Sequence, residues 1–274
     1  MKTGFVSSVC VASFSIALGA CAGTPAAFEP KAVSADPAHE GYLSRIDLQL
    51  LADAVPPPPA AGSHIEAADR ALSATYRALE NTDRWLMATS HAEVRSPFAL
   101  QHFDCSLGVR FDPGQNAAPA TARLMQRLFE DSEAASTIAK LRAHRARPVG
   151  DDPSREACQR VSDSGRASAS YPSGSATVAA AYGEAMAAIA PEHAAAARET
   201  GHQIALSRVV CAMHYPLDAT TGEALGKAVF ERAAATPQFQ TDLALARLEY
   251  ASLKASGKTS PACAAERLAL SQKP

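Results

Sequence analysis

The sequence predicts an all-α protein with a single helical domain over residues 46–270. Apolar residues recur at helical spacing in several windows, whereas the alternating apolar and polar pattern of a half-buried strand is scarce. Prolines and N-capping residues divide these windows at the intervals expected of globular helices. With 274 residues, of which 47% are hydrophobic and 20% charged, the chain has the length and composition to bury a core.

The N-terminal half is expected to begin with a tether, residues 22–45, rich in Ala, Pro and Gly. The four prolines at 56–59 indicate that an extended arm follows. Apolar residues then recur near helical spacing across 64–91 and again across 124–141, which predicts helices in both windows. The less regular residues 96–117 predict a long ordered connection between them.

The C-terminal half is expected to hold a helix from about Ser175 to Ala190, because Ser173 is a good N-cap and Pro191 opposes continuation. Its predicted core residues are Val178, Met186 and Ile189. Three more helices are expected, over residues 192–214, from 218 to about 236, and over 238–254 as the last element.

Residues 1–21 have the layout of an export signal, because Lys2 is followed by an apolar stretch and by small residues. The Leu-Gly-Ala before Cys21 resembles the bacterial lipoprotein cleavage box, in which the cysteine becomes the lipidated first residue. Since Ala22 rather than an acidic residue follows, the resemblance implies a periplasmic protein anchored to the outer membrane, with the lipid as its membrane contact. A plain signal peptide cut nearby is the alternative.

The formal net charge of −2 provides no basic field for a nucleic-acid backbone, so we expect no nucleic-acid partner. Outside the export segment the cysteines are an even set: Cys105, Cys158, Cys211 and Cys263. In an oxidising compartment they predict two disulfides, and three pairings are open. Their spacing does not match a zinc site, so we expect neither a metal ion nor a cofactor.

His214 and Asp218 form a candidate catalytic pair. A histidine that attacks phosphorus must be unprotonated on the attacking nitrogen, and a carboxylate near the other nitrogen selects that tautomer. Pro216 lies between the two residues and predicts a helix end at His214 and an N-cap at Asp218. Both residues are therefore expected close together.

Lys140, Arg147 and Arg208 are candidate ligands of a phosphoryl group, because its chemistry needs cations around the oxygens. Lys140 and Arg147 are seven residues apart, so one unbroken helix would place them on the same face. The Pro-Ser-Gly turn at 172–174 adds free backbone N–H groups for an anion. Taken singly, each residue is better explained by a structural role, and only the combination predicts a phosphate site.

The spacing of three motifs resembles the phosphatase signature shared by bacterial class A non-specific acid phosphatases, type 2 phosphatidic acid phosphatases and vanadium haloperoxidases. The motifs are Lys140, six residues and Arg147-Pro148; Pro172-Ser173-Gly174; and Ser207-Arg208, five residues, His214, three residues and Asp218. Further stretches look like the class A acid phosphatases in order and spacing, namely 51–63, 104–111, 170–174, 207–211 and 236–240.

This resemblance implies a helical bundle of the acid phosphatase and haloperoxidase type. It implies an acid phosphatase that hydrolyses phosphate monoesters at acidic pH through a phosphohistidine, without a metal ion. By position, His214 is the expected nucleophile and Asp218 its orienting partner. The residues expected to bind the phosphoryl oxygens are Lys140, Arg147, Arg208, Ser173 and Gly174.

The same resemblance implies small phosphorylated substrates and inhibition by inorganic phosphate and vanadate. It allows a homo-oligomer, because related enzymes commonly self-associate. Cys105 and Cys158 fall where some relatives carry a matched pair, which implies a disulfide between them. Cys211 is then left to pair with Cys263.

The chain departs from the signature at Ser175, which stands where the family has a histidine that protonates the leaving alkoxide. A serine hydroxyl is too weak an acid for that role, and general acid catalysis is worth about 10²–10⁴ in rate. Among the other histidines, His144 follows Lys140 by four residues and would share its helix face, although a surface role suits His144 better.

Three interpretations follow from this departure. The first is an acid phosphatase that is weakened or shifted toward good leaving groups such as aryl alcohols. The second is a catalytically impaired envelope protein that binds phosphate or a phosphorylated ligand. The third is a vanadate-dependent peroxidase, which the flanking stretches disfavour because they match acid phosphatases.

Overall fold

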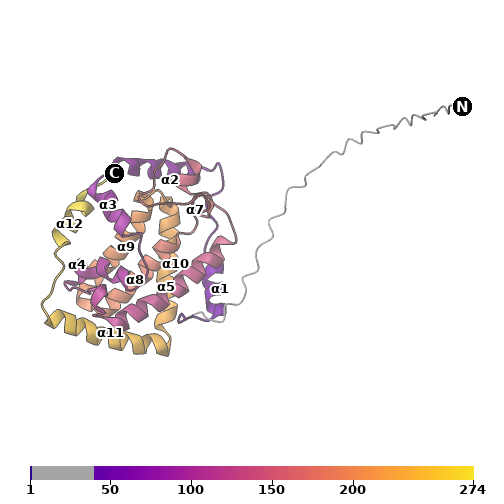
Figure 1. Ribbon diagram of the computed structural model, residues 1–274. Coiled ribbons are helices and arrows are strands. Elements are labelled where there is room, and N and C mark those ends of the chain that lie inside the picture. Colours follow the sequence, from indigo (N-terminus) through magenta and orange to yellow (C-terminus); the bar gives the residue numbers. More distant parts are fainter. Residues whose placement is uncertain (2–39) are drawn as a thin grey trace. The chain divides into compact units, whose positions relative to one another are not determined.

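The structure is a computed structural model that describes Met1 and residues 40–274 (Figure 1). In this part of the chain it contains twelve α-helices, four short 3₁₀ helices and no strand, which confirms the all-α prediction. Residues 40–274 lie within one compact unit. The predicted export signal after Met1, which ends at Cys21, lies outside the described residues, and so does most of the predicted tether.

Helix α8 (Gly174–Ile189) is the central element of the fold (Figure 1). It packs against α9 (Ala194–Val210), α10 (Pro216–Ala234) and α5 (Pro119–Lys140). Ser173 caps α8, because its Oγ accepts a hydrogen bond from the Ala176 N–H at 3.3 Å. The predicted helix and its cap are therefore confirmed.

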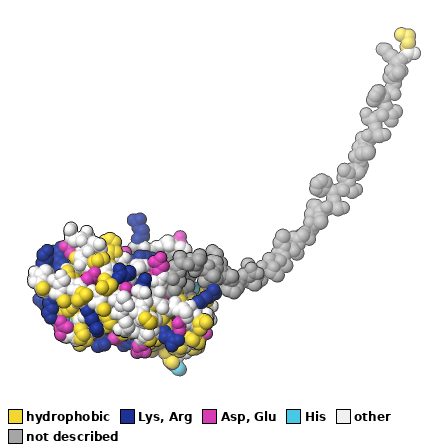
Figure 2. Space-filling model, turned by 90° about the horizontal axis from the view of Figure 1, so that it is seen from below, with side chains coloured by type: hydrophobic (Ala, Val, Ile, Leu, Met, Phe, Trp, Pro, Cys, Tyr) yellow, Lys and Arg dark blue, Asp and Glu magenta, His cyan; other side chains and the backbone are white. Residues whose placement is uncertain are grey.

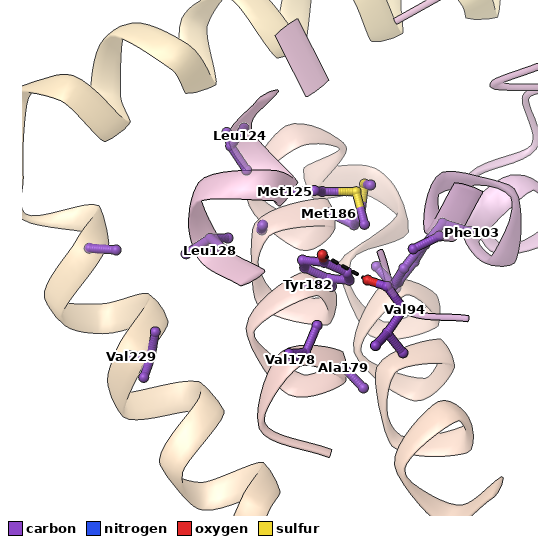
Figure 3. Packing of buried hydrophobic residues seen from close by; sticks show 14 of the residues in the cluster. Val94, Phe103, Leu124, Met125, Leu128, Val178, Ala179, Tyr182, Met186 and Val229 are labelled. Carbon is purple, nitrogen blue, oxygen red and sulfur yellow. Dashed lines mark hydrogen bonds between the residues drawn. The ribbon is translucent and has the colours of Figure 1, made fainter. Parts of the chain in front are cut away.

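The main hydrophobic core surrounds α8 (Figure 3). The predicted core residues of this helix are buried, with exposures of 0% for Val178, 0% for Met186 and 2% for Ile189. Tyr182 is also buried on α8, and its hydroxyl donates a hydrogen bond to the Val94 carbonyl at 3.0 Å, so its polar atom is satisfied inside the core.

Two glycines let α10 lie directly against α8. A Cβ on Gly222 would collide with the carbonyl oxygen of Ser173, and one on Gly226 would collide with that of Thr177. The Ser173 N–H donates to the Asp218 carbonyl at 2.9 Å, which ties the first turns of the two helices together. These contacts bring two of the predicted motifs to one end of the bundle.

Helix α1 (Arg45–Asp53) adds Leu48 and Ala52 to this core, whereas α2 (His64–Thr75) and α3 (Asp83–Ser90) lie outside it. Each has a capping side chain in front of it, from Ser44, Ser63 and Thr82 respectively. The helical window at 64–91 is broken by the 3₁₀ helix η1 (Tyr76–Leu79). Its periodic residues do not all face the core, since Ile65, Leu72 and Leu86 are exposed.

The expected connection at 96–117 is ordered and partly helical, because its apolar side chains enter the core. It contains three short elements: η2 (Phe98–Phe103), α4 (Asp104–Leu107) and η3 (Pro113–Gln115). Its buried core residues include Phe103, Leu107, Val109 and Phe111.

The C-terminal half differs from the prediction in three respects. After η4 (Pro191–His193), α9 ends at Val210 rather than at residue 214, because the N–H groups of Met213 and His214 both donate to the Arg208 carbonyl. Helix α10 begins at Pro216, two residues earlier than expected. Helix α11 (Pro237–Ala255) is not the last element, since α12 (Cys263–Ser271) follows it.

The cysteines pair differently from the expected arrangement. Cys105 is bonded to Cys263, with 5.4 Å between their Cα atoms, and Cys158 is bonded to Cys211, with 4.7 Å. The expected pairing is therefore wrong. The reason is tertiary: the segment that begins α12 lies beside α4, whereas the end of α9 lies beside the 158 loop.

Basic and acidic side chains are interspersed on the face shown in Figure 2, in line with the small formal net charge of −2. Among the described residues, no helix has the length and apolarity needed to cross a bilayer.

Candidate active site

The first motif lies at the C-terminal end of α5 and in the loop after it. Helix α5 ends at Lys140, and Arg147 precedes the short helix α6 (Pro148–Asp151). The prediction that Lys140 and Arg147 share one helix face is therefore wrong. The loop nevertheless returns Arg147 to the neighbourhood of Lys140, and its positive charge helps to lower the pKa of Lys140.

His214 is buried, with an exposure of 3%, and both ring nitrogens are in contact with the protein. Nδ1 lies 2.8 Å from the Ser170 carbonyl oxygen, which can only accept a hydrogen bond, so Nδ1 carries the proton. Nε2 lies 3.0 Å from Nη1 of Arg147, which can only donate. The neutral imidazole therefore has its lone pair on Nε2.

The pKa of His214 is lowered to about 3, mainly by burial. The nearby Asp218 carboxylate opposes this shift, and the positive charge of Arg147 adds to it. The imidazole is therefore neutral at pH values above about 3.

Asp218 lies next to His214, as predicted, but its contact is partly indirect. Its Oδ2 is 3.8 Å from Nδ1 of His214, whereas the Ser170 hydroxyl lies 2.5 Å from Oδ2 and 3.3 Å from Nδ1. Asp218 is not the N-cap residue: it sits in the first turn of α10 and accepts the Tyr215 N–H at 2.8 Å. Ser170 thus bridges the carboxylate and the imidazole.

Arg147 is held in place by neutral oxygen atoms. Its guanidinium donates to the carbonyls of Met213 at 2.8 Å and Ala169 at 3.2 Å, and to the Ser168 hydroxyl at 2.9 Å. Because these partners carry no charge, they orient the guanidinium without cancelling its charge.

Arg208 is buried to 4% exposure, and its Nη2 donates to Oε1 of Gln159 at 2.8 Å. Its Nε has no hydrogen-bond partner among the described residues. Burial lowers the pKa of Arg208 to about 10, and the charge of Arg147 contributes. The disulfide between Cys158 and Cys211 joins the Gln159 loop to the end of α9, three residues after Arg208.

Gly174 lies against the end of α5. A Cβ at this position would be 2.9 Å from Oε1 of Glu133, 3.1 Å from the Ser136 hydroxyl and 3.3 Å from Nζ of Lys140. Burial lowers the pKa of Lys140 to about 8, although the charge of Glu133 raises it. Glycine leaves room for these three side-chain ends beside the N-terminal end of α8.

Ser175 is half-buried in the first turn of α8, directly after Gly174. His144 is exposed, and its Nε2 lies 3.2 Å from the Ala167 carbonyl, beside the short helix α7 (Asp163–Ala167). Because α5 has already ended at Lys140, the expectation that His144 shares its helix face is wrong. His144 instead contacts the residue before Ser168, whose hydroxyl accepts a hydrogen bond from Arg147.

Several residues of the site were not predicted from the sequence. Arg145 forms an ion pair with Asp218, Ser170 contacts both members of the pair, Gln159 holds Arg208, and Glu133 lies beside Gly174. Arg145 and Ser170 had a sequence signal, since Arg145 lies in the same basic stretch as Lys140 and Arg147, and Ser170 begins the stretch 170–174. Gln159 and Glu133 lie outside the predicted motifs.

No group of three or more His, Cys, Asp or Glu side chains within the described ranges has a geometry that could hold a metal ion.

Fold and site together define an all-helical protein with a neutral, buried histidine beside a carboxylate and three cationic side chains. No protein-family model matches the chain. It is 28% identical over 203 residues to a protein named acid phosphatase from Zymomonas mobilis, a match that covers 74% of this chain and 76% of the relative.

Two proteins named non-specific acid phosphatase are also similar. The one from Providencia stuartii is 27% identical over 201 residues, which cover 73% of this chain and 80% of the relative. The one from Salmonella typhimurium is 27% identical over 200 residues, which cover 71% and 78%. These relatives support a bacterial acid phosphatase family for the chain.

Proposed function

We propose that this protein is an acid phosphatase that hydrolyses phosphate monoesters with His214 as the nucleophile. Relatives named acid phosphatase, matched over most of both chains, support a phosphatase enzyme that acts on small phosphorylated substrates. They do not favour the alternative of a catalytically impaired phosphate-binding protein.

The observation that carries this proposal is the tautomer of His214. Nδ1 donates to the Ser170 carbonyl, which leaves the Nε2 lone pair directed toward Arg147. A phosphoryl group bound by that guanidinium would lie within reach of this lone pair. As Nε2 attacks, Asp218 would stabilise the positive charge that develops on the ring.

Lys140, Arg147 and Arg208 would bind the phosphoryl oxygens. Guanidinium groups suit this role because they can donate to two oxygens at once. The Gly174 N–H belongs to the first turn of α8, where free N–H groups and the helix dipole favour an anion. Ser173 would contribute mainly by capping the same turn, because its Oγ accepts the Ala176 N–H.

In the first step, Nε2 would form a bond to phosphorus while the bond from phosphorus to the leaving oxygen breaks. The leaving oxygen then needs a proton, and Ser175 is a poor donor. We therefore propose that the protein favours leaving groups that depart as stable anions, such as aryl alcohols. In the second step, water attacks the phosphohistidine, releases inorganic phosphate and restores the neutral imidazole.

The test is turnover of an aryl phosphate at acidic pH by the purified protein and by a His214→Ala variant. We expect hydrolysis by the wild type, inhibition by vanadate, and no hydrolysis above background by the variant. Equal rates for the two proteins would refute the proposal. Thermal stabilisation by millimolar phosphate in the absence of any turnover would support the binding protein instead.

We also propose that residues 1–21 direct export to the periplasm and that Cys21 carries a lipid at the outer membrane, with residues 22–45 as tether to a domain over 46–270. The mass of the mature N-terminus tests this proposal, and an unmodified Cys21 there would contradict lipidation. Light scattering tests the homo-oligomer that the resemblance allows.

A further inference from the structure

Arg145 is a buried arginine that joins the candidate catalytic carboxylate to another part of the fold. It lies in the loop between α5 and α6 and is 5% exposed. Its Nη1 lies 2.6 Å from Oδ1 of Asp218, and its Nη2 lies 2.7 Å from Oδ2 of Asp69 on α2. One guanidinium therefore connects two buried carboxylates.

We propose that Arg145 is a positioning residue for His214, acting through Asp218 and Tyr215. This inference rests on the proposed function, in which His214 is the nucleophile. It adds a residue that does not itself contact the phosphoryl group but determines how the nucleophile is held and how basic it is.

The first argument is geometric. The Arg145 guanidinium lies over the ring of Tyr215, 4.3 Å from its centroid, and is paired with Asp218. Tyr215 and Asp218 are the first and the fourth residues after His214, so Arg145 contacts the chain on the C-terminal side of the nucleophile. Asp69 contacts the same segment, because its Oδ1 accepts the Leu217 N–H at 3.0 Å.

The second argument is electrostatic. Asp218 has no exposed surface, and each of its carboxylate oxygens accepts hydrogen bonds: Oδ1 from Arg145, and Oδ2 from Ser170 and Tyr215. The positive charge of Arg145 offsets the negative charge of Asp218, which would otherwise stabilise a protonated His214. Protonation of the imidazole is therefore less favourable. Arg145 thereby helps to keep His214 neutral at acidic pH.

The titratable groups that surround Asp218 come from several elements. They are His214, Arg145, Arg147, Lys140, Asp69 and Tyr171. Arg145 is the cation among them that forms an ion pair with Asp218 at hydrogen-bond distance. Its removal would therefore change the field at the carboxylate more than the loss of a more distant cation.

The experiment compares Arg145→Lys and Arg145→Gln with the wild type in aryl phosphate hydrolysis. Lysine retains the charge, but its single ammonium cannot reproduce the planar guanidinium that donates to both carboxylates and stacks on Tyr215. We expect kcat to fall by on the order of 10²-fold in Arg145→Lys, with KM changed by less than about threefold, because the nucleophile is misplaced while the phosphate ligands remain. In Arg145→Gln the acidic limb of kcat/KM should also move to higher pH, because His214 becomes easier to protonate.

Arg155→Lys is the matched control. Arg155 is likewise 5% exposed and is bonded to the Ser73 carbonyl on α2 at 3.0 Å, and it has no contact with Asp218. We expect this variant to keep the kcat and the pH profile of the wild type. An Arg145→Lys variant with the kcat and pH profile of the wild type, or an equal loss of kcat in Arg155→Lys, would overturn the inference.

If thermal unfolding shows that neither Arg145 variant folds, the Asp69→Asn variant tests the positioning role instead. Asp69→Asn weakens the contact between Arg145 and residue 69, so kcat should fall at unchanged KM. A kcat equal to that of the wild type would overturn the inference. The His214→Ala variant separates the two proposals. If it retains turnover, the proposed function fails; if it is inactive while Arg145→Lys resembles the wild type, only the positioning role fails.

Discussion

In the wild type, kcat/KM should decline at basic pH, near the Lys140 pKa of about 8. Replacing Lys140 with arginine should remove this decline. Burial lowers this pKa, so the free enzyme carries the Lys140 charge below pH 8 and loses it above. The substrate does not add a second limb in this range, because a phosphate monoester has a second pKa of about 6 and remains a dianion.

The size of the effect follows from the contact that is lost. A hydrogen bond from a charged donor is worth about 1.5–3 kcal/mol, which corresponds to a loss of roughly 10- to 150-fold in kcat/KM once Lys140 is neutral. The decline is about tenfold for each pH unit until this limit is reached. Because a bound phosphoryl group stabilises the ammonium, kcat itself should change less over the same range.

The assay is kcat/KM for an aryl phosphate between pH 5 and pH 10, with the wild type, Lys140→Arg and a control. Arginine stays charged to higher pH than lysine, so the Lys140→Arg profile should be flat between about pH 7 and pH 9, where the wild type declines. Lys254→Arg is the control, because Lys254 is an exposed residue of α11 paired with Glu192. The reasoning is refuted if Lys140→Arg retains the limb or if the wild type has none.

Three other predictions follow from the site. Ser175→His should raise kcat on alkyl phosphates by up to about 10²–10⁴-fold and on aryl phosphates much less, measured as kcat for matched substrates; equal gains would mean that another group supplies the proton. Gly174→Ala should raise KM by roughly tenfold, because its Cβ would lie 3.3 Å from Nζ of Lys140, whereas Gly114→Ala, with open space around its Cβ, should not. The double variant Cys158→Ser/Cys211→Ser should lower the free energy of unfolding by about 4 kcal/mol at most, from a loop of 53 residues. Denaturant unfolding measures this loss, and an unchanged midpoint would count against the pairing.

The parts of the fold that could be predicted from the sequence are those encoded locally. Both ends of α8 are set by neighbouring residues, Ser173 at its start and Pro191 after its end, and the structure has them there. The three motifs were recognisable because their spacing is fixed along the chain. The fold brings them to one end of the bundle, where His214 contacts Arg147 and the Asp218 carbonyl accepts the Ser173 N–H.

Other features depend on contacts between distant residues and could not be read from the sequence. The residues after Lys140 have good helix propensity, yet α5 ends there because Arg142, Arg145 and Arg147 make buried or partly buried contacts elsewhere. The turn before His214 contains Ala212 with a φ of 55°, in the left-handed region. Because alanine seldom adopts this conformation, the sequence does not predict it. Disulfide pairing likewise depends on which loops the fold brings together.

The central claim, that His214 is a nucleophile, is tested most directly by trapping the intermediate. The protein is mixed with an aryl phosphate, quenched within milliseconds under alkaline conditions that preserve phosphohistidine, digested, and examined by mass spectrometry. The account predicts a phosphoryl group on the peptide that contains His214 and none on the corresponding peptide of His214→Ala. Turnover with no phosphorylated His214, or with the phosphoryl group on another residue, would contradict it.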